Sequence, residues 1–437
     1  MKRYTFFATI LLIFSLFPST RGQDTIRMLS FNIWQEGTQV TNGLEKIRDV
    51  ILAVDPDVVC FAEVRNYSGD WTTKILDALS AEGKNYHGHF YGGDVSLISK
   101  YPILSGEVVY NGNGSVVNYR LEAPSTEIVV GCAHLDYTYY ACYLPRGYNG
   151  GDPDWSMIDD GTGNPDPVTD VNEILTYDLK SKRDEQVAAF LDAVSDDTVP
   201  VFLMGDFNEP SWLDWTEKTD TMFDHHGVVI EWPVTKDLDD GGFLDAFRTF
   251  YPDEARNPGI TWPSYATDKG STSWTPKADE RDRIDFIFFR GDRLEVVDAA
   301  LVGPRESYAY NVVDTTCTSH EKFLAADLPW PSDHKAAYAA VRIDTTDTTT
   351  YAAIPPDVPA FTITPNPAEN ELHLVLSRPA SQAEVEVFSV DGQRLRTFRL
   401  GEGQNFTLSV EGLPRGVHLL RIQDREKILG TRTVVFR

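Results

Sequence analysis

The sequence is poor in cysteine, in methionine and in positive charge. Its 437 residues include four cysteines, five methionines and 39 basic residues against 66 acidic ones, for a net charge of −27. No cysteine spacing matches a zinc pattern, which argues against a structural zinc site. The tail 356–437 holds equal numbers of basic and acidic residues. Residues 23–355 hold 26 basic against 56 acidic residues, which is a net charge near −30. This charge disfavours long nucleic acid as a ligand, although a local basic groove is not excluded.

Long apolar runs are also scarce. The run at 6–17 follows Met1-Lys2-Arg3 and is shorter than the roughly 20 residues that span a bilayer. We therefore predict a secretory signal peptide over residues 1–22, with cleavage after Gly22. No later run is long enough for a membrane helix, so we expect an exported protein without a stable membrane span.

The four cysteines fit an exported protein only loosely. Cys60 and Cys132 lie inside apolar runs, where we expect buried free thiols. Cys142 and Cys317 lie in polar, loop-like segments. A disulfide between these two is as plausible as two free thiols.

Strand and helix patterns alternate through the first 340 residues. Helical spacing of apolar residues marks 44–54 and 182–193, and the expected strands are 26–33, 58–64, 95–99, 128–134, 199–204, 284–289 and 336–343. This alternation predicts a layered α/β domain over residues 23–343. Two long loops, 137–178 and 305–330, adjoin candidate catalytic segments. We expect them to wall the substrate cleft, the alternative being mobile surface insertions.

The chain ends in a smaller unit. Residues 344–359 have the Thr, Asp and Pro content of a linker. Residues 360–437 alternate as strands at 371–376, 385–390 and 418–422, with Asp391-Gly392 as a hairpin turn. They predict a small β-sandwich without catalytic groups.

Three motifs of the tail resemble the C-terminal sorting domain of the type IX secretion system. They are Thr364-Pro365-Asn366-Pro367-Ala368, residues 387–393 and Leu413-Pro414-Arg415-Gly416-Val417-His418. The resemblance implies the type IX secretion machinery as a partner, with export through the outer membrane to the cell surface or the medium. The alternative is an ordinary spacer or carbohydrate-binding sandwich.

Polar side chains interrupt or end the apolar runs of the main domain. They are Asn32, Glu63, His134, Asp206, Asn208, Asp285, Asp333 and His334. Cleavage of a phosphate ester needs a cation on the phosphate, a base for water and donors for the developing charge. These residue types supply all three, so the set predicts a metal-dependent phosphoester hydrolase.

Roles can be assigned to these side chains from their chemistry. Glu63 is the best ligand for Mg²⁺, with Asn32 and Asp333 as partners, and Mn²⁺ or Ca²⁺ would accept similar ligands. Asp206 and Asn208 are two apart in an extended segment and point to one side, so one can deprotonate water while the other donates to the phosphate.

The histidines supply charge to the same site. His334 suits stabilisation of the transition state when Asp285 keeps it charged, and His134 is a second donor. Arg120 is more readily interpreted as a solvated strand residue than as a phosphate ligand. Whether Asp206 or the His334–Asp285 pair is the formal base stays open, and the segment 91–94 carries no residue with an assigned role.

The joint order of these motifs resembles the endonuclease/exonuclease/phosphatase superfamily, the DNase I-like fold, across residues 26–343. The resemblance implies a four-layer α/β/β/α sandwich of two mixed β-sheets with the site at one rim. It implies Asn32, Glu63 and Asp333 as the metal shell and Asp206 and Asn208 at water and phosphate. It also implies that His134, Asp285 and His334 stabilise the transition state.

The leading hypothesis is therefore a secreted, monomeric, Mg²⁺-dependent phosphodiesterase. Because the main domain is acidic, a small-molecule or lipid-headgroup diester is favoured over DNA or RNA, and a secreted nuclease is the alternative. Two hypotheses of another class are a non-catalytic binding protein on the same fold and a surface adhesin in which the domain is a spacer.

Overall fold

The computed structural model describes residues 24–344 except 152–153, 160, 267 and 317, and residues 361–437 except for short gaps. These gaps are 366–367, 369, 381–382, 390–392 and 425–426. The expected signal peptide, nearly all of the linker, Cys317 and the turn Asp391-Gly392 lie outside the described residues. The chain divides into two compact units between Thr346 and Asp347. The domain boundaries that we predicted from the sequence, including those of the signal peptide and the linker, stay predictions.

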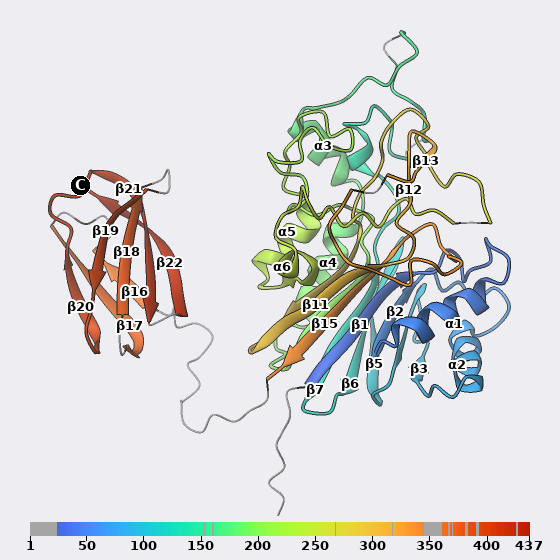
Figure 1. Cartoon of the computed structure of the whole chain (residues 1–437), viewed down its shortest axis with the longest axis horizontal. Coiled ribbons are helices and arrows are strands. Elements are labelled where there is room, and N and C mark those ends of the chain that lie inside the picture. Colours follow the sequence, from blue (N-terminus) through green and yellow to red (C-terminus); the bar gives the residue numbers. More distant parts are fainter. Residues whose placement is uncertain are drawn as a thin grey trace, which may run out of the picture. The chain divides into compact units, whose positions relative to one another are not determined.

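Two mixed sheets form the centre of the first unit (Figure 1). The first has the order β14-β11-β15-β1-β2-β4-β3 and the second the order β5-β6-β7-β8-β10-β9. The strands of the first sheet are β1 (Asp24–Asn32), β2 (Val58–Ala62), β3 (His87–His89), β4 (Val95–Ser99), β11 (Leu294–Val302), β14 (Phe323–Leu324) and β15 (Ala336–Ile343). Those of the second are β5 (Ile103–Gly112), β6 (Gly114–Glu122), β7 (Glu127–His134), β8 (Val201–Asp206), β9 (Leu244–Asp245) and β10 (Asp285–Arg290).

The strands alternate their side chains between two apolar cores. Ile26 and Met28 of β1 pack in one buried cluster with Cys132 and Met204 of the second sheet, so this core lies between the sheets. Leu29, also on β1, belongs to a different cluster, which includes residues of the helices α1 (Gly43–Val54) and α2 (Trp71–Ala81). Since side chains of a strand alternate in direction, each sheet has an inner and an outer face.

Helices cover the outer face of the second sheet as well. Phe190 of α4 (Arg183–Ala193) and Leu238 of α5 (Pro233–Asp240) pack with Leu203 of β8. The remaining helical elements of the unit are η1 (Ala141–Tyr143), α3 (Val171–Asp178) and α6 (Ala246–Phe250), and a two-stranded sheet pairs β12 (Ser307–Ala309) with β13 (Val312–Asp314). The result is the predicted four-layer α/β/β/α sandwich.

Strand direction brings the polar residues to one edge. β1 runs parallel to β2, and β7 runs parallel to β8, so their carboxyl ends point the same way. β10 is antiparallel to β8 and β15 is antiparallel to β1, so the beginnings of β10 and β15 lie at that same edge. In the register, Asp285 faces Asp206 and His134 faces Asp206.

The loop 137–178 is a packed structure rather than a surface insertion. Its buried residues include Tyr140, Tyr143 and Tyr148, which share an apolar cluster with Trp215 and Trp232. The loop also contains η1 and α3. These three tyrosines are therefore used to fold the loop.

Arg183, at the start of α4, fixes the beginning of this loop. Its buried guanidinium donates to three backbone carbonyls at 2.9 to 3.0 Å and pairs with two buried carboxylates at 2.6 and 3.2 Å. The carbonyls are those of Asp136, Thr138 and Tyr139, and the carboxylates those of Asp178 and Glu209.

We predict that Arg183→Met lowers the free energy of unfolding by about 3–5 kcal/mol, because it leaves two buried carboxylates without their cation. The neighbouring Lys182→Met is the control, since Lys182 pairs with Glu185 at the exposed surface and such pairs contribute about 0–1 kcal/mol. Urea unfolding of the two variants measures the difference. Equal stabilities would contradict a structural role for the Arg183 cluster.

Three cysteines are described, and all are buried and free. This confirms the prediction for Cys60 and Cys132, which lie on β2 and β7. The prediction for Cys142 was wrong: it lies in η1 and is only 4% exposed, because the loop around it folds into an apolar core. Its free thiol agrees with the second of the two alternatives, free thiols rather than a disulfide, and Cys317 lies outside the described residues.

The second unit is an all-β sandwich, as predicted. One sheet has the order β16-β17-β20 and the other the order β19-β18-β21-β22, and they share one apolar core. The strands are β16 (Phe361–Thr364), β17 (Glu371–Ala380), β18 (Ala383–Ser389), β19 (Arg394–Arg399), β20 (Gly403–Ser409), β21 (Gly416–Asp424) and β22 (Lys427–Phe436). Within the described part of the chain, no helix combines the length and apolarity needed to cross a bilayer.

Candidate active site

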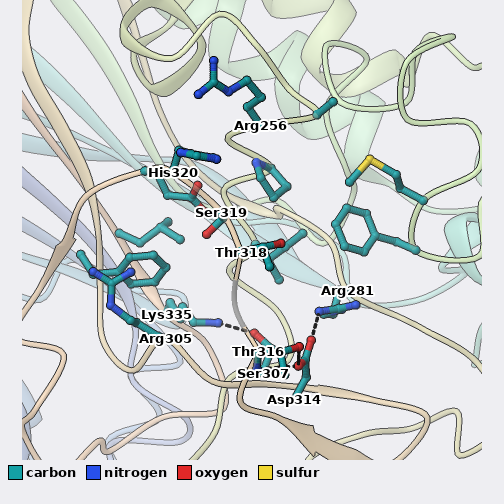
Figure 2. Close-up of a pocket in the computed structure, with 18 residues that line it drawn as sticks. Arg256, Arg281, Arg305, Ser307, Asp314, Thr316, Thr318, Ser319, His320 and Lys335 are labelled. Carbon is teal, nitrogen blue, oxygen red and sulfur yellow. Dashed lines mark hydrogen bonds and ion pairs between the residues drawn. The ribbon is translucent and has the colours of Figure 1, made fainter.

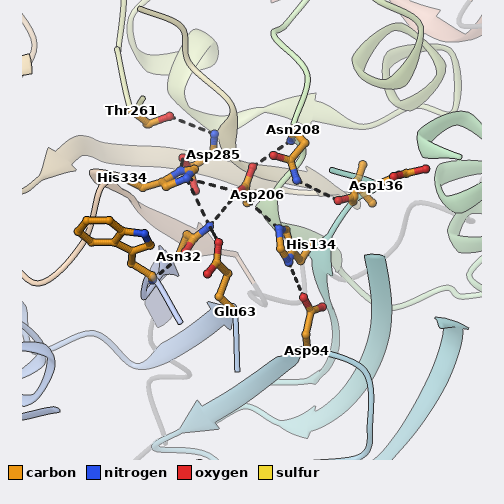
Figure 3. A network of polar contacts seen from close by, with 12 residues as sticks. Asn32, Glu63, Asp94, His134, Asp136, Asp206, Asn208, Thr261, Asp285 and His334 are labelled. Atoms are coloured by element: carbon orange, nitrogen blue, oxygen red, sulfur yellow. Dashed lines mark hydrogen bonds and ion pairs between the residues drawn. The ribbon is translucent and has the colours of Figure 1, made fainter. Parts of the chain in front are cut away.

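The structure gathers the predicted polar residues of the first unit at the shared sheet edge (Figure 3). Asn32, His134 and Asp206 are the last residues of β1, β7 and β8, and Asp285 is the first residue of β10. Glu63 follows β2 in the left-handed region at φ 67°, and Asn208 has φ 52°. Non-glycine residues seldom adopt this conformation, and those that do cluster at functional sites.

Asp206 lies at the centre of the site. Its Oδ2 accepts a hydrogen bond from Asn32 Nδ2 at 2.9 Å, and its Oδ1 accepts one from the Asn208 backbone N–H at 2.9 Å. The Nε2 atoms of His134 and His334 lie 3.8 and 3.7 Å from Asp206 Oδ2. As expected, Phe207 is buried in the apolar core below. One carboxylate thus meets an amide and two imidazoles.

Each histidine is held by a second carboxylate through Nδ1. His334 Nδ1 lies 2.9 Å from Asp285 Oδ2, and His134 Nδ1 lies 2.6 Å from Asp94 Oδ2. Burial lowers the pKa of both imidazoles, but the carboxylates outweigh it and raise the pKa of His134 to about 9 and that of His334 to about 10. Both side chains are therefore charged at neutral pH, with Nε2–H directed at Asp206.

Asp94 is a site residue that the sequence interpretation missed. Burial raises its pKa, but the charge of His134 outweighs this and lowers the pKa to about 2. Arg65 Nη1 lies 2.9 Å from the same oxygen. The sequence does hold a signal for Asp94, because this residue directly precedes β4. Since β4 is antiparallel to β2, β4 begins at the edge where β2 ends.

Asn208 is oriented by a residue from the long loop. Its Oδ1 accepts a hydrogen bond from Tyr140 Oη at 2.7 Å, and its Nδ2 donates to the Leu135 carbonyl at 2.9 Å. The second Nδ2–H has no partner among the described residues, so it is available to a bound phosphate. Tyr140 was not predicted, because nothing in the sequence separates it from the other tyrosines of the loop.

Glu63 and Asp333 have the chemistry of metal ligands. Asp333 is buried and its Oδ1 has no hydrogen-bond partner among the described residues. Burial, together with the nearby charges of Glu63 and Asp206, raises the pKa of Asp333 to about 8 against the opposing charge of His334. A divalent cation would remove this repulsion between buried carboxylates. Hard oxygen donors of this kind fit such a cation.

A second donor set lies beside the first. Asp206, Asp285 and His334 each offer one ligand atom, and these atoms all lie within 4.8 Å of one another. The structure thus holds a buried Asp/Asp/His cluster suited to a metal ion. Asp333 and Glu63 border it: the charges of His334 and Asp206 act on the pKa of Asp333, and Asn32 Nδ2 lies 3.3 Å from Glu63 Oε1 and 2.9 Å from Asp206 Oδ2.

Arg120, in contrast, lies away from the site. In the register of β6 and β7 it faces Val129, whereas Ser115 faces His134 at the catalytic edge. Its guanidinium pairs with Asp197 at 2.6 Å. Arg120 is thus a half-exposed, ion-paired strand residue.

Aromatic side chains flank the two histidines. The Tyr137 ring lies 6.3 Å from the His134 ring and is 47% exposed. Trp262 lies 5.0 Å from the His334 ring and contacts Trp274, which is 39% exposed. The loop 137–178 therefore borders the site through Tyr137 and Tyr140.

Comparisons with known proteins agree with this geometry. Residues 29–334 match the model of the Endonuclease/Exonuclease/phosphatase family, and residues 362–436 match that of the Secretion system C-terminal sorting domain. The chain is 32% identical to "Uncharacterized protein F14F9.5" of Caenorhabditis elegans over 317 residues, 72% of this chain and 90% of that protein.

Solved structures with similarity to the chain include two from animals. TDP2 from C. elegans is 15% identical, with a TM-score of 0.41 over 73% of this chain and 75% of that one. The human Nocturnin catalytic domain with a bound sulfate anion is 16% identical, with a TM-score of 0.39 over 73% of this chain and 97% of that one. These TM-scores are low, so the assignment to a family depends on the match to the family model and on the residues of the site.

The sorting domain indicates export, to the cell surface or the medium, by the secretion machinery that reads it. The main domain supplies the chemistry, with its carboxylates, amides and paired histidines at one sheet edge. The chain belongs to the endonuclease/exonuclease/phosphatase family and is a metal-dependent phosphoester hydrolase.

Proposed function

We propose that the protein is an exported Mg²⁺-dependent phosphodiesterase that cleaves small phosphodiesters by in-line attack of water. The observation that carries this proposal is the pair of charged imidazoles, His134 and His334, whose Nε2 atoms lie 3.8 and 3.7 Å from one oxygen of Asp206. Two cationic donors that lie around one carboxylate can stabilise the negative charge that a phosphoryl group gains there in the transition state.

The charge on the histidines favours Asp206 over the His334–Asp285 pair as the base. A general base must be unprotonated, and the pKa of His334 is raised to about 10, so this imidazole donates a proton at neutral pH rather than accepting one. Asp206 is then the residue that orients water and accepts its proton. Asn208 Nδ2 and the two histidines hold the phosphoryl oxygens.

Glu63, Asn32 and Asp333 would hold the metal, which supplies a Lewis acid for the phosphoryl oxygen. We favour this set over Asp206, Asp285 and His334 because Asp285 Oδ2 already holds His334 Nδ1 at 2.9 Å. Ligation by Asp285 would remove the carboxylate that keeps His334 charged. The partnerless Asp333 Oδ1 has no such competing role.

The substrate class follows from charge and from the exposed aromatics. The main domain has a net charge near −30, which weakens binding to long polyanions. Tyr137 and Trp274 are exposed beside the site and suit the organic part of a small diester, such as a lipid headgroup. Because aromatic rings also stack on bases, cleavage of nucleic acid is the alternative function.

A substrate panel tests this proposal. Choline-type diesters, sugar phosphates, plasmid DNA and RNA are incubated with the full chain at low salt, each with Mg²⁺ or with EDTA. We expect Mg²⁺-dependent hydrolysis of the small diesters at the highest rate. Faster cleavage of plasmid or RNA would establish the nuclease instead, and equal rates in EDTA would contradict metal dependence.

Asp94→Asn is expected to move the pH profile. His134 is protonated below its pKa of about 9, so activity that needs the cation is lost as the pH rises through that value. Without the Asp94 charge the pKa of His134 falls, and we expect the alkaline limb of kcat/KM to shift down by about one to three pH units. An unchanged limb would mean that His134 does not act as a cation. Asp77→Asn, on the exposed side of α2, is the control.

A further inference from the structure

A second cavity lies apart from the catalytic residues and has a volume of about 640 Å³ (Figure 2). This volume is typical of small-molecule sites. Its walls come from residues of the segments 222–223, 255–260, 301–307, 314–316 and 318–323, together with Arg281 and Lys335. None of the catalytic or metal-site residues described above lines it.

The cavity carries an excess of positive charge within a strongly acidic domain. Its lining includes the cationic side chains of Arg256, Arg281, Arg305 and Lys335, with His320 beside them. The carboxylates among the described lining residues are those of Asp314 and Glu321. Since acidic residues outnumber basic ones about twofold in this domain, such a local excess of cations is unusual.

Two of these cations form no ion pair with a described residue. Arg281 is paired, with Nη1 2.6 Å from Asp314 Oδ2. Among the described residues, Arg256, Arg305 and His320 form no ion pair, and all three are exposed. Arg305 is steadied by the Phe323 ring, 4.6 Å from its guanidinium carbon. The mouth of the cavity therefore presents available donors.

The floor of the cavity is buried and polar. Lys335 is 1% exposed, and its Nζ donates to Ser307 Oγ at 2.6 Å. Glu321 is 4% exposed, and its Oε2 has no hydrogen-bond partner among the described residues. Burial raises the pKa of the Glu321 carboxyl group above its usual value. Buried polar groups without partners point to a missing ligand atom.

We propose that this cavity binds a small organic anion that carries a phosphate or sulfate group, separately from the catalytic site. Guanidinium groups bind tetrahedral oxyanions through paired N–H donors, and Arg256 and Arg305 supply them. Lys335 adds charge below, and Phe223 and Phe323 line the cavity for the organic part of the ligand. This site goes beyond the proposed hydrolysis, because none of the residues assigned to catalysis or to the metal lines it.

Calorimetric titration of the full chain in EDTA tests the proposal with three probes: inorganic phosphate, sulfate and p-nitrophenyl phosphate. We expect saturable binding of at least one probe at low ionic strength, and the phosphate and sulfate arms identify the preferred group. Arg256→Ala with Arg305→Ala should weaken binding about tenfold or more. Arg48→Ala is the control. Arg48 lies on α1 and pairs with Asp49, so this variant removes a charge outside the cavity and should leave probe binding unchanged.

Two further variants separate this site from its alternatives. His134→Ala should leave binding intact, since that residue belongs to the catalytic site. Glu321→Gln should also retain binding, because it keeps the size of the side chain and removes an acidic group that does not attract an anion. Three results would overturn the proposal. They are the absence of saturable binding, loss of binding in His134→Ala, and binding by the double arginine variant that equals that of the parent protein. Loss of binding in Glu321→Gln would indicate a cationic ligand and would overturn it too.

Discussion

Asp206→Asn lowers kcat/KM for a phosphodiester by about a hundredfold or more, with the fold intact. The amide keeps the size of the side chain, and its single carbonyl oxygen can still accept one of the two hydrogen bonds, from Asn32 or from the Asn208 backbone N–H. It cannot accept a proton from water, and it removes the negative charge that lies between the two imidazoles. Loss of a proton acceptor typically costs about 10²–10⁴ in rate, and the measurement is kcat/KM of both proteins at saturating Mg²⁺.

Asp197→Asn is the matched control for this variant. Asp197 pairs with Arg120 at 2.6 Å, well along the sheet from the catalytic edge, so we expect its activity to stay close to that of the parent. An Asp206→Asn protein that folds and retains a tenth or more of the parent activity would remove Asp206 from the chemistry. The His334–Asp285 pair would then be the remaining candidate base.

Glu63→Gln reduces activity by about a hundredfold or more at about 1 mM Mg²⁺, and part of the loss is recovered at higher Mg²⁺. The carboxylate charge is the main attraction that this side chain offers a hard cation. The amide keeps an oxygen to accept the hydrogen bond from the Gln35 backbone N–H, which lies 2.8 Å from Glu63 Oε2. Activity is measured as a function of Mg²⁺ concentration.

Glu45→Gln on the exposed face of α1 is the comparison for Glu63→Gln, since it removes the same charge away from the site. A shift in the Mg²⁺ concentration for half-maximal activity is expected for Glu63→Gln alone. If the loss is the same at every Mg²⁺ concentration, Glu63 does not bind the metal. The Asp206, Asp285 and His334 set would then hold it.

Much of the site could be predicted because its residues follow apolar runs that are clear in the sequence. Asn32, His134 and Asp206 each end a strand that is buried along nearly all its length, and such runs have a simple pattern. Parallel pairing then brings their ends together. The same reasoning located Glu63 and the Asp333-His334 segment.

Other features depend on contacts between distant segments, which no local pattern records. Asp94 reaches His134 across 40 residues, and Tyr140 reaches Asn208 across 68. Cys142 was placed in a polar loop because its neighbours are tyrosines and glycines, yet those rings form their own core around it. The cationic cavity combines six separate segments, so it becomes visible only in the folded domain.

Hydrolysis of bis-p-nitrophenyl phosphate tests the central claim most directly. The full chain and its Asp206→Asn variant are compared in EDTA, in Mg²⁺ and in Mn²⁺. We predict p-nitrophenol release by the parent protein with either metal, none in EDTA, and a loss of about a hundredfold or more in the variant. Release that persists in EDTA, or that is equal in the two proteins, would contradict metal-assisted hydrolysis at this site.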